Sequence, residues 1–271
     1  YYTEAKRNTN INILETILTS EMQNFQKNFG RINVESKIVG YKEILWESRQ
    51  TIAEKELDLP SINLETEGFW INFDVKIIEK LRKEQLLTIG KNDYGNRWEE
   101  IKKLVRARDR YSCQLCGIIE ENKAHHVHHK KPFKLCSSVE EANHLSNLIT
   151  LCSSCHHKVE INVKVRSGLS GLGFLLRSLA PLYLMCDYSD VDVFTETSSV
   201  IADGNPICIF YDLVPFGIGL SVNFYQKFDQ LLPDLLLHIN QCPCQHGCPA
   251  CVGPVSENTV DVKEETKNLL I

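Results

Sequence analysis

The sequence predicts an α+β fold in which a β-rich scaffold is combined with two segments that are stapled by zinc. Residues 1–74 carry apolar residues in alternating or clustered runs between turn signals, which is typical of strands. Two later segments, 98–108 and 224–241, repeat apolar residues at helical spacing. Short-spaced cysteine sets occur in the middle of the chain and near its C-terminus.

Strands are expected first along the chain, at 31–39 and 69–73. The segment Leu57-Asp-Leu-Pro60 ends another apolar run, because proline cannot continue a hydrogen-bonded ladder. Residues 76–87 have apolar residues near helical spacing. The pattern repeats at 98–108 with basic residues between, which predicts a helix leading into the central segment.

The second half predicts a buried helix at 168–186, broken near Pro181, because proline removes a backbone donor. A buried strand follows at 206–211, and a helix at 224–241 stops just before the last cysteines. We therefore expect three parts, 1–97, 98–166 and 167–271. Four aspartates of the last part suggest either a second acidic site or ordinary strand-end and loop carboxylates, and we favour the latter: Asp187, Asp190, Asp192 and Asp212.

Charge is distributed unevenly along the 271 residues, whose net charge is −5. Residues 98–166 hold twelve basic and eight acidic residues, whereas 167–271 hold four and twelve. A local basic patch attracts phosphates more effectively than the average charge suggests. The chain begins with Tyr1, shows no secretory leader, and has no apolar run of the roughly 18–20 residues that a membrane helix needs. We expect a piece of a longer, cytoplasmic protein that does not contact a membrane.

Eight of the eleven cysteines fall into sets whose spacing suits metal binding. Two C-x-x-C pairs, Cys113/Cys116 and Cys152/Cys155, can complete one tetrahedral zinc site. Four more thiols lie within ten residues and suit a second zinc, with an iron–sulfur cluster as the competitor: Cys242, Cys244, Cys248 and Cys251. The other three, Cys136, Cys186 and Cys208, are expected to be free thiols.

Thirty-five residues separate the first two cysteine pairs, so a functional segment is expected between them. That segment contains Ala124-His-His-Val-His-His-Lys-Lys-Pro132, and Asn147-Leu-Ile-Thr-Leu-Cys152 and Cys155-His-His157 follow. The order closely resembles the HNH endonuclease family, also called the ββα-metal nucleases, over about a quarter of the chain.

This resemblance implies hydrolysis of a phosphodiester by an imidazole base and a divalent ion, Mg²⁺ or Mn²⁺. By the family pattern, His129 is the general base, and His128 and His156 bind the catalytic ion, with His157 as an alternative to His156. Asn147 hydrogen-bonds within the loop that carries His129 and orients its ring. His125 and His126 are expected to be exposed loop residues. Five basic residues are candidates for DNA phosphate contacts, although a solvated basic face explains them equally well: Arg108, Arg110, Lys130, Lys131 and Lys134.

The C-terminal run, C-x-C-x-x-x-C-x-x-C, is similar to the zinc-binding domain of the MrfA-type DNA-repair helicases, a superfamily-two group. Flanking segments strengthen the similarity, among them Glu65-Thr-Glu-Gly-Phe-Trp70 and Ile209-Phe-Tyr-Asp212. The similarity implies that the HNH module is inserted in a helicase accessory region and that the motor domains lie elsewhere in the full-length chain or in a partner. The chain departs from that family at Gly168-Leu-Ser-Gly171 and Pro215-Phe-Gly217, which leaves any role of those positions open.

Together the two resemblances predict a metal-dependent DNA endonuclease that acts with a helicase in DNA repair or in defence. The alternative is a non-catalytic module that binds DNA or docks a protein. Cleavage of RNA is a third possibility, because nothing in the sequence reads a 2′-hydroxyl.

Overall fold

The computed structural model describes residues 1–22, 25–46, 51–74, 94–121, 123–131, 136, 138–254 and 261–270, without the side chains at 157 and 160–162. The described residues form two compact units, Tyr1–Val75 with Gly173–Leu235, and Lys76–Leu172 with Leu236–Ile271. The fold mixes helices and strands, as predicted. Among the described residues, none of the helices is both long and apolar enough to cross a membrane.

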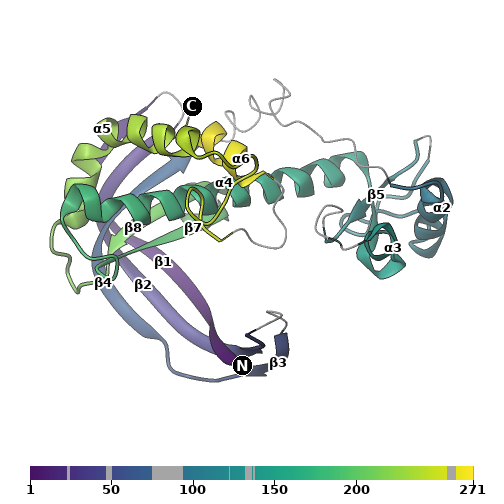
Figure 1. Cartoon of the computed structure of the whole chain (residues 1–271), viewed down its shortest axis with the longest axis horizontal. Helices are drawn as coiled ribbons and strands as arrows, with labels where there is room; N and C mark the ends of the chain where they lie inside the picture. Colours follow the sequence, from purple (N-terminus) through teal and green to yellow (C-terminus); the bar gives the residue numbers. More distant parts are fainter. Residues whose placement is uncertain are drawn as a thin grey trace. The chain divides into compact units, whose positions relative to one another are not determined.

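The first unit is built on a six-stranded sheet with the order β1-β2-β4-β8-β7, in which β3 also pairs with β2 (Figure 1). Every neighbouring pair is antiparallel. The strands are β1 (Tyr2–Glu21), β2 (Phe25–Ile44), β3 (Thr51–Glu56), β4 (Ile62–Phe73), β7 (Val191–Ser199) and β8 (Asn205–Asp212). β4 pairs with β8 although residues 74–204 separate them in the sequence. The predicted strands at 31–39, 69–73 and 206–211 lie within β2, β4 and β8.

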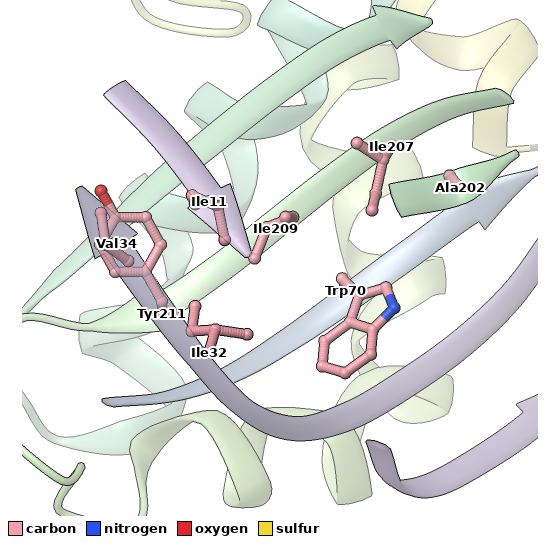
Figure 2. Close-up of a cluster of buried hydrophobic side chains, with 8 residues drawn as sticks. All are labelled: Ile11, Ile32, Val34, Trp70, Ala202, Ile207, Ile209 and Tyr211. Carbon is pink, nitrogen blue, oxygen red and sulfur yellow. The ribbon is translucent and has the colours of Figure 1, made fainter. Parts of the chain in front are cut away.

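Apolar side chains cover both faces of this sheet. Figure 2 shows one cluster, in which Ile32, Trp70 and Ile209 are fully or almost fully buried with residues of β1 and of the short helix η3 (Val200–Ala202). The opposite face carries Phe69 and Phe210, which pack against Phe224 of helix α5 (Leu220–Gln241). Because successive side chains of a strand alternate between faces, neighbouring residues such as Phe69 and Trp70 pack into different hydrophobic clusters.

Asp212 is fully buried at the end of β8, where its carboxylate holds the start of α5. It accepts hydrogen bonds from the backbone N–H groups of Ile218, Leu220 and Ser221 and from the Ser221 hydroxyl. A carboxylate near the first turn of a helix satisfies donors that have no partner within the helix. This explains why α5 begins at Leu220, four residues before its apolar periodicity. Among the described residues, the four aspartates at 187, 190, 192 and 212 form no cluster that could share an ion.

The long helix α4 (Ser153–Leu184) differs from the prediction at both ends. It begins fifteen residues before 168, and it continues through Pro181 instead of breaking there. Pro181 lies in the last turn of the helix, and its missing N–H leaves one carbonyl of the preceding turn without its intrahelical bond. The helix ends at Leu184, and the next residue, Met185, has a left-handed φ of 54°. The prediction of a break near Pro181 was therefore wrong.

The second unit contains short elements around the histidine-rich segment and a final helix. They are α2 (Trp98–Arg108), β5 (His126–His129), α3 (Val139–Ala142), η2 (Leu145–Asn147), β6 (Leu148–Leu151) and α6 (Val262–Leu270). β5 and β6 form an antiparallel pair in which His128 lies opposite Ile149. The helix expected at 98–108 is α2, and the one expected at 76–87 lies outside the described residues. A two-stranded pair followed by the start of α4 gives the ββα order that the HNH resemblance implies.

Candidate metal centre and nucleic-acid interface

The first cysteine set gathers four thiols from three places in the chain. Cys113 and Cys116 lie in the turn after α2, Cys152 follows β6, and Cys155 is in the first turn of α4. Their sulfur atoms all lie within 4.8 Å of one another, and those of Cys116 and Cys152 are 3.7 Å apart. Zn–S bonds of about 2.3 Å place tetrahedral sulfur ligands about 3.8 Å apart. The four thiols therefore fit a structural zinc ion.

Burial alone would raise the pKa of the Cys113 thiol. Backbone N–H groups of Cys152, Cys116 and Leu115 outweigh it and lower this pKa to about 6. Hydrogen bonds that favour the charged form act in this direction. A thiolate at neutral pH is the form that binds zinc. Among the described residues, the buried cluster at this site consists of Cys113, Leu151 and Cys152, with three partly buried side chains packed against it. A core this small depends on the metal for stability.

The second set is equally compact. The sulfur of Cys242 lies 3.5 Å from those of Cys244 and Cys248, and Cys248 and Cys251 are 3.7 Å apart. These separations suit one tetrahedral ion and leave no room for the several metal and sulfide atoms of an iron–sulfur cluster, so they favour zinc. Lys263 of α6 is buried, and its ammonium donates to the carbonyls of Cys242 and Cys244 at 2.6 and 2.8 Å.

Three histidines of the HNH segment form a cluster. His126 and His128 are two residues apart on β5, which places them on the same face of the strand. The His156 ring of α4 contacts both, with ring centroids 4.9 Å from His126 and 5.1 Å from His128. Because His156 directly follows Cys155, the zinc-held turn also positions this ring. The structure thus brings the two predicted ligands of the catalytic ion, His128 and His156, together.

His126 is exposed but lies in β5, so the expectation that it is a loop residue was wrong. The ring of His125 hydrogen-bonds the carbonyl of Ile118 at 2.9 Å and belongs to a different contact. Burial, and then the nearby rings of His156 and His129, lower the pKa of His128 to about 4. The neutral imidazole, which is the form that binds a metal, therefore predominates at neutral pH. The side chain of His157, the alternative ligand, lies outside the described residues.

His129, the predicted base, is held by contacts that the sequence did not reveal. Its Nε2 lies 3.1 Å from Oδ1 of Asn143, whose amide nitrogen donates to the carbonyl of Tyr94 at 2.8 Å. The rings of Trp98 and Tyr94 lie nearly parallel to the imidazole, with centroids 5.1 and 5.5 Å away. Burial lowers the pKa of His129, and the hydrogen bond to Asn143 partly offsets this.

Asn147 holds the backbone that follows His129. Its Oδ1 accepts from the N–H of Lys131 at 2.7 Å, and its Nδ2 donates to the carbonyls of Lys131 and Ala142. Its own carbonyl accepts from the N–H of Lys130 at 2.8 Å. Asn147 thus braces the loop that carries the predicted base, while Asn143 contacts the ring itself.

The predicted phosphate-binding residues have unequal surroundings. Arg108 donates to the carbonyls of Leu145 and Leu148 and to Asp109, so its guanidinium braces the module. Lys131 pairs with Glu141 at 2.9 Å. Arg108 is nevertheless exposed, as are Arg110 and Lys130, and the ammonium of Lys130 donates to the carbonyl of Ser146. Lys134 lies outside the described residues.

Comparisons with known proteins give these two regions their family. Residues 113–160 match the family model "HNH endonuclease", and residues 172–252 match the model "MrfA Zn-binding domain". Two domain families therefore meet in this chain. The HNH match spans both C-x-x-C pairs and the histidine cluster, and the MrfA match ends just after the second cysteine set.

Similar proteins are known in curated and structural form. A 102-residue stretch is 34% identical to the uncharacterized ATP-dependent helicase YprA of Bacillus subtilis, covering 38% of this chain and 13% of that protein. A 67-residue stretch is 36% identical to Zorya protein ZorE of Escherichia coli, covering 24% and 17%.

A crystal structure of the DUF1998 helicase MrfA bound to DNA matches the whole chain and 25% of its own, with a TM-score of 0.55 and 20% identity, which shows a shared fold. The chain therefore spans a quarter or less of the length of each of these proteins. It carries one segment that matches the HNH model and one that matches the MrfA zinc-binding model.

Proposed function

We propose that this chain is a metal-dependent DNA endonuclease that works with a helicase motor. The observation that carries the proposal is the orientation of the His129 ring by Asn143, beside the paired imidazoles of His128 and His156. A structural zinc module alone has no need of a half-buried neutral imidazole held in one orientation next to a potential ion site. A hydrolytic site needs both.

His129 acts in this proposal as the general base. Since Nδ2 of Asn143 donates to Tyr94, Oδ1 accepts from the ring and Nε2 carries the proton. The other nitrogen, Nδ1, then takes a proton from the attacking water. The lowered pKa keeps the ring neutral and ready for this step at neutral pH.

Two further groups of residues complete the site. His128 and His156 would hold a divalent ion, which supplies charge neutralisation at the scissile phosphate and at the leaving oxygen. Arg110 and Lys130 are exposed basic residues of the same module and would contact the DNA backbone without reading its sequence. The similarity to helicases supports delivery of the DNA by motor domains in the full-length chain or in a partner, in repair or in defence.

The test compares cleavage of supercoiled plasmid by the wild-type chain, His129→Ala and His144→Ala, with added divalent ions. His144 is an exposed histidine of the same module whose ring bonds Ser146 and caps the short helix η2. We expect nicking by the wild type and by His144→Ala and none by His129→Ala. If none of them cuts DNA with or without the helicase, while all retain DNA binding, the non-catalytic alternative holds. Preferential cutting of single-stranded RNA would reassign the substrate.

A further inference from the structure

The sequence pattern of the HNH family uses His128 and His156, yet the structure adds a third imidazole to them. His126 is one full strand repeat before His128, and its ring is as close to His156 as the His128 ring is. Of the neighbouring histidines, His125 bonds Ile118 and His129 bonds Asn143. His126 is thus the one described histidine beside the pair that the proposed mechanism does not use.

The ring separations suit a shared ion. Two imidazoles that bind one ion through N–metal bonds of about 2.1 Å have ring centres roughly 4.5–5.2 Å apart, depending on whether the angle between them is octahedral or tetrahedral. The observed separations from His156, 4.9 and 5.1 Å, fall within that range. The His126 ring lies nearly parallel to that of His156, at 29°, and has to turn for its nitrogen to reach the ion. The trio is more open than the cysteine sets, since within the described residues only those sets bring three ligand atoms within 4.8 Å of one another. His126 is exposed, so its ring can turn towards His156 without displacing buried groups.

We propose that His126 is a third protein ligand of the ion held by His128 and His156, and that this imidazole set selects divalent transition metals such as Co²⁺ or Ni²⁺ over Mg²⁺. Imidazole nitrogen is a preferred ligand of these ions, whereas Mg²⁺ prefers carboxylate, carbonyl and water oxygen. Binding of the ion is independent of cleavage, but its catalytic role rests on the proposed function. His126 would then determine which ion supports the reaction.

The experiment uses the chain with both structural sites loaded, verified as two zinc ions per molecule. Calorimetric titration with Ni²⁺ should show one further ion in the wild type. His126→Ala should weaken this binding at least tenfold, and the matched control His125→Ala should not change it. Equal Ni²⁺ affinity in the wild type and in a folded His126→Ala would overturn the proposal.

A second readout covers the case in which the substitution disturbs the module. NMR spectra of the Co²⁺-loaded wild type should show paramagnetically shifted, non-exchanging C–H signals from three coordinating imidazole rings at this site. Such signals from only two rings in the wild type itself would overturn the proposal without any variant.

Plasmid nicking separates the two proposals. A third ion that binds through His126 without any cutting would contradict the endonuclease and leave the metal site intact. Cutting that is equally fast in Mg²⁺ and Co²⁺, and unchanged in His126→Ala, would contradict the role of His126 and leave the endonuclease intact.

Discussion

Nε2 of His129 donates a hydrogen bond to Oδ1 of Asn143, at a distance of 3.1 Å. Asn143 is itself buried, and its amide group is fixed by the carbonyl of Tyr94, so the acceptor cannot turn away. The pair selects one tautomer of the imidazole, with the proton on Nε2. In the proposed mechanism this hydrogen bond makes Asn143 a positioning residue, because it acts through His129.

Replacing Asn143 with alanine should therefore slow cleavage while leaving DNA affinity unchanged. Correct placement of a general base is worth about 10²–10⁴-fold, and we expect Asn143→Ala to lose roughly the lower end of that range. Single-turnover cleavage and fluorescence anisotropy with labelled DNA measure the two quantities. Asn143→Asp, which keeps the acceptor, should recover most of the rate. A rate equal to that of the wild type in Asn143→Ala would show that the hydrogen bond does not position the base.

The pH profile of cleavage should reflect the lowered pKa of His129. The base works in its neutral form, so the rate is full above its pKa and falls as the pH drops through it. Because burial places this pKa below the ordinary value of 6.5, the rate should be more than half maximal at pH 6.5. A carboxylate in Asn143→Asp stabilises the imidazolium and should move the acid limb to higher pH. A midpoint above 6.5 in the wild type would contradict the assignment of His129 as the base.

Substitutions of Arg108 and Arg110 should affect different properties, the first the stability of the module and the second its affinity for DNA. Arg108→Gln loses bonds to two backbone carbonyls and to Asp109; because the side chain is partly exposed, we expect a loss of about 1 kcal/mol in unfolding free energy. Arg110→Gln should leave stability unchanged and reduce the slope of DNA affinity against salt by about 1. Thermal denaturation and anisotropy at several salt concentrations test both. A reduced salt slope in Arg108→Gln would show that it contacts phosphate after all.

Gly171 of α4 should tolerate no side chain where α6 packs against it. An added Cβ would lie 2.0 Å from the hydroxyl oxygen of the buried Thr266. Overpacking of this kind costs roughly 1–3 kcal/mol, which exceeds the gain of about 1 kcal/mol in helix propensity. We expect Gly171→Ala to lower the unfolding free energy and to speed hydrogen exchange in α6.

Two variants control that experiment. Ser170→Ala, at the exposed neighbouring position of the same helix, should be neutral. Adding Thr266→Ala to Gly171→Ala removes the clashing oxygen and should restore part of the lost stability. No recovery in the double variant would show that the clash is not the cause.

Several elements could be predicted because their local pattern matches their surroundings. β4 and β8 are buried on both faces, so their apolar runs are continuous, and α2 and α5 show their periodicity directly. β1 gave only a general β-rich signal, because this edge strand is exposed along most of its length and carries few apolar residues. The start of α4 was missed because Ser153–His156 is polar and serves the metal sites. The start of α5 depends on Asp212, a cap that local periodicity cannot reveal.

The residues of the candidate site likewise divide into those that the sequence indicated and those that only tertiary contacts reveal. Spacing pointed to the cysteine sets, and the resemblance to the HNH family pointed to His128, His129 and Asn147. Asn143 and Tyr94 were missed because their roles arise from contacts between segments far apart in the sequence. The spacing of two residues between His126 and His128 places both rings on one face only if the segment is a strand. The sequence alone did not establish that it is one.

Because Cys155 and His156 are adjacent, the proposed catalytic site should respond to the redox state of its surroundings. Thiolates are the form that oxidants attack, and Cys116 of the same zinc set is solvent-exposed. Oxidation of this set would release the zinc, unwind the first turn of α4 and carry His156 away from His128. A mild oxidant should therefore reduce the cleavage rate to the same extent that it releases zinc, and a reductant with added zinc should restore the rate. Loss of zinc without loss of cutting would show that His156 does not depend on the thiol staple.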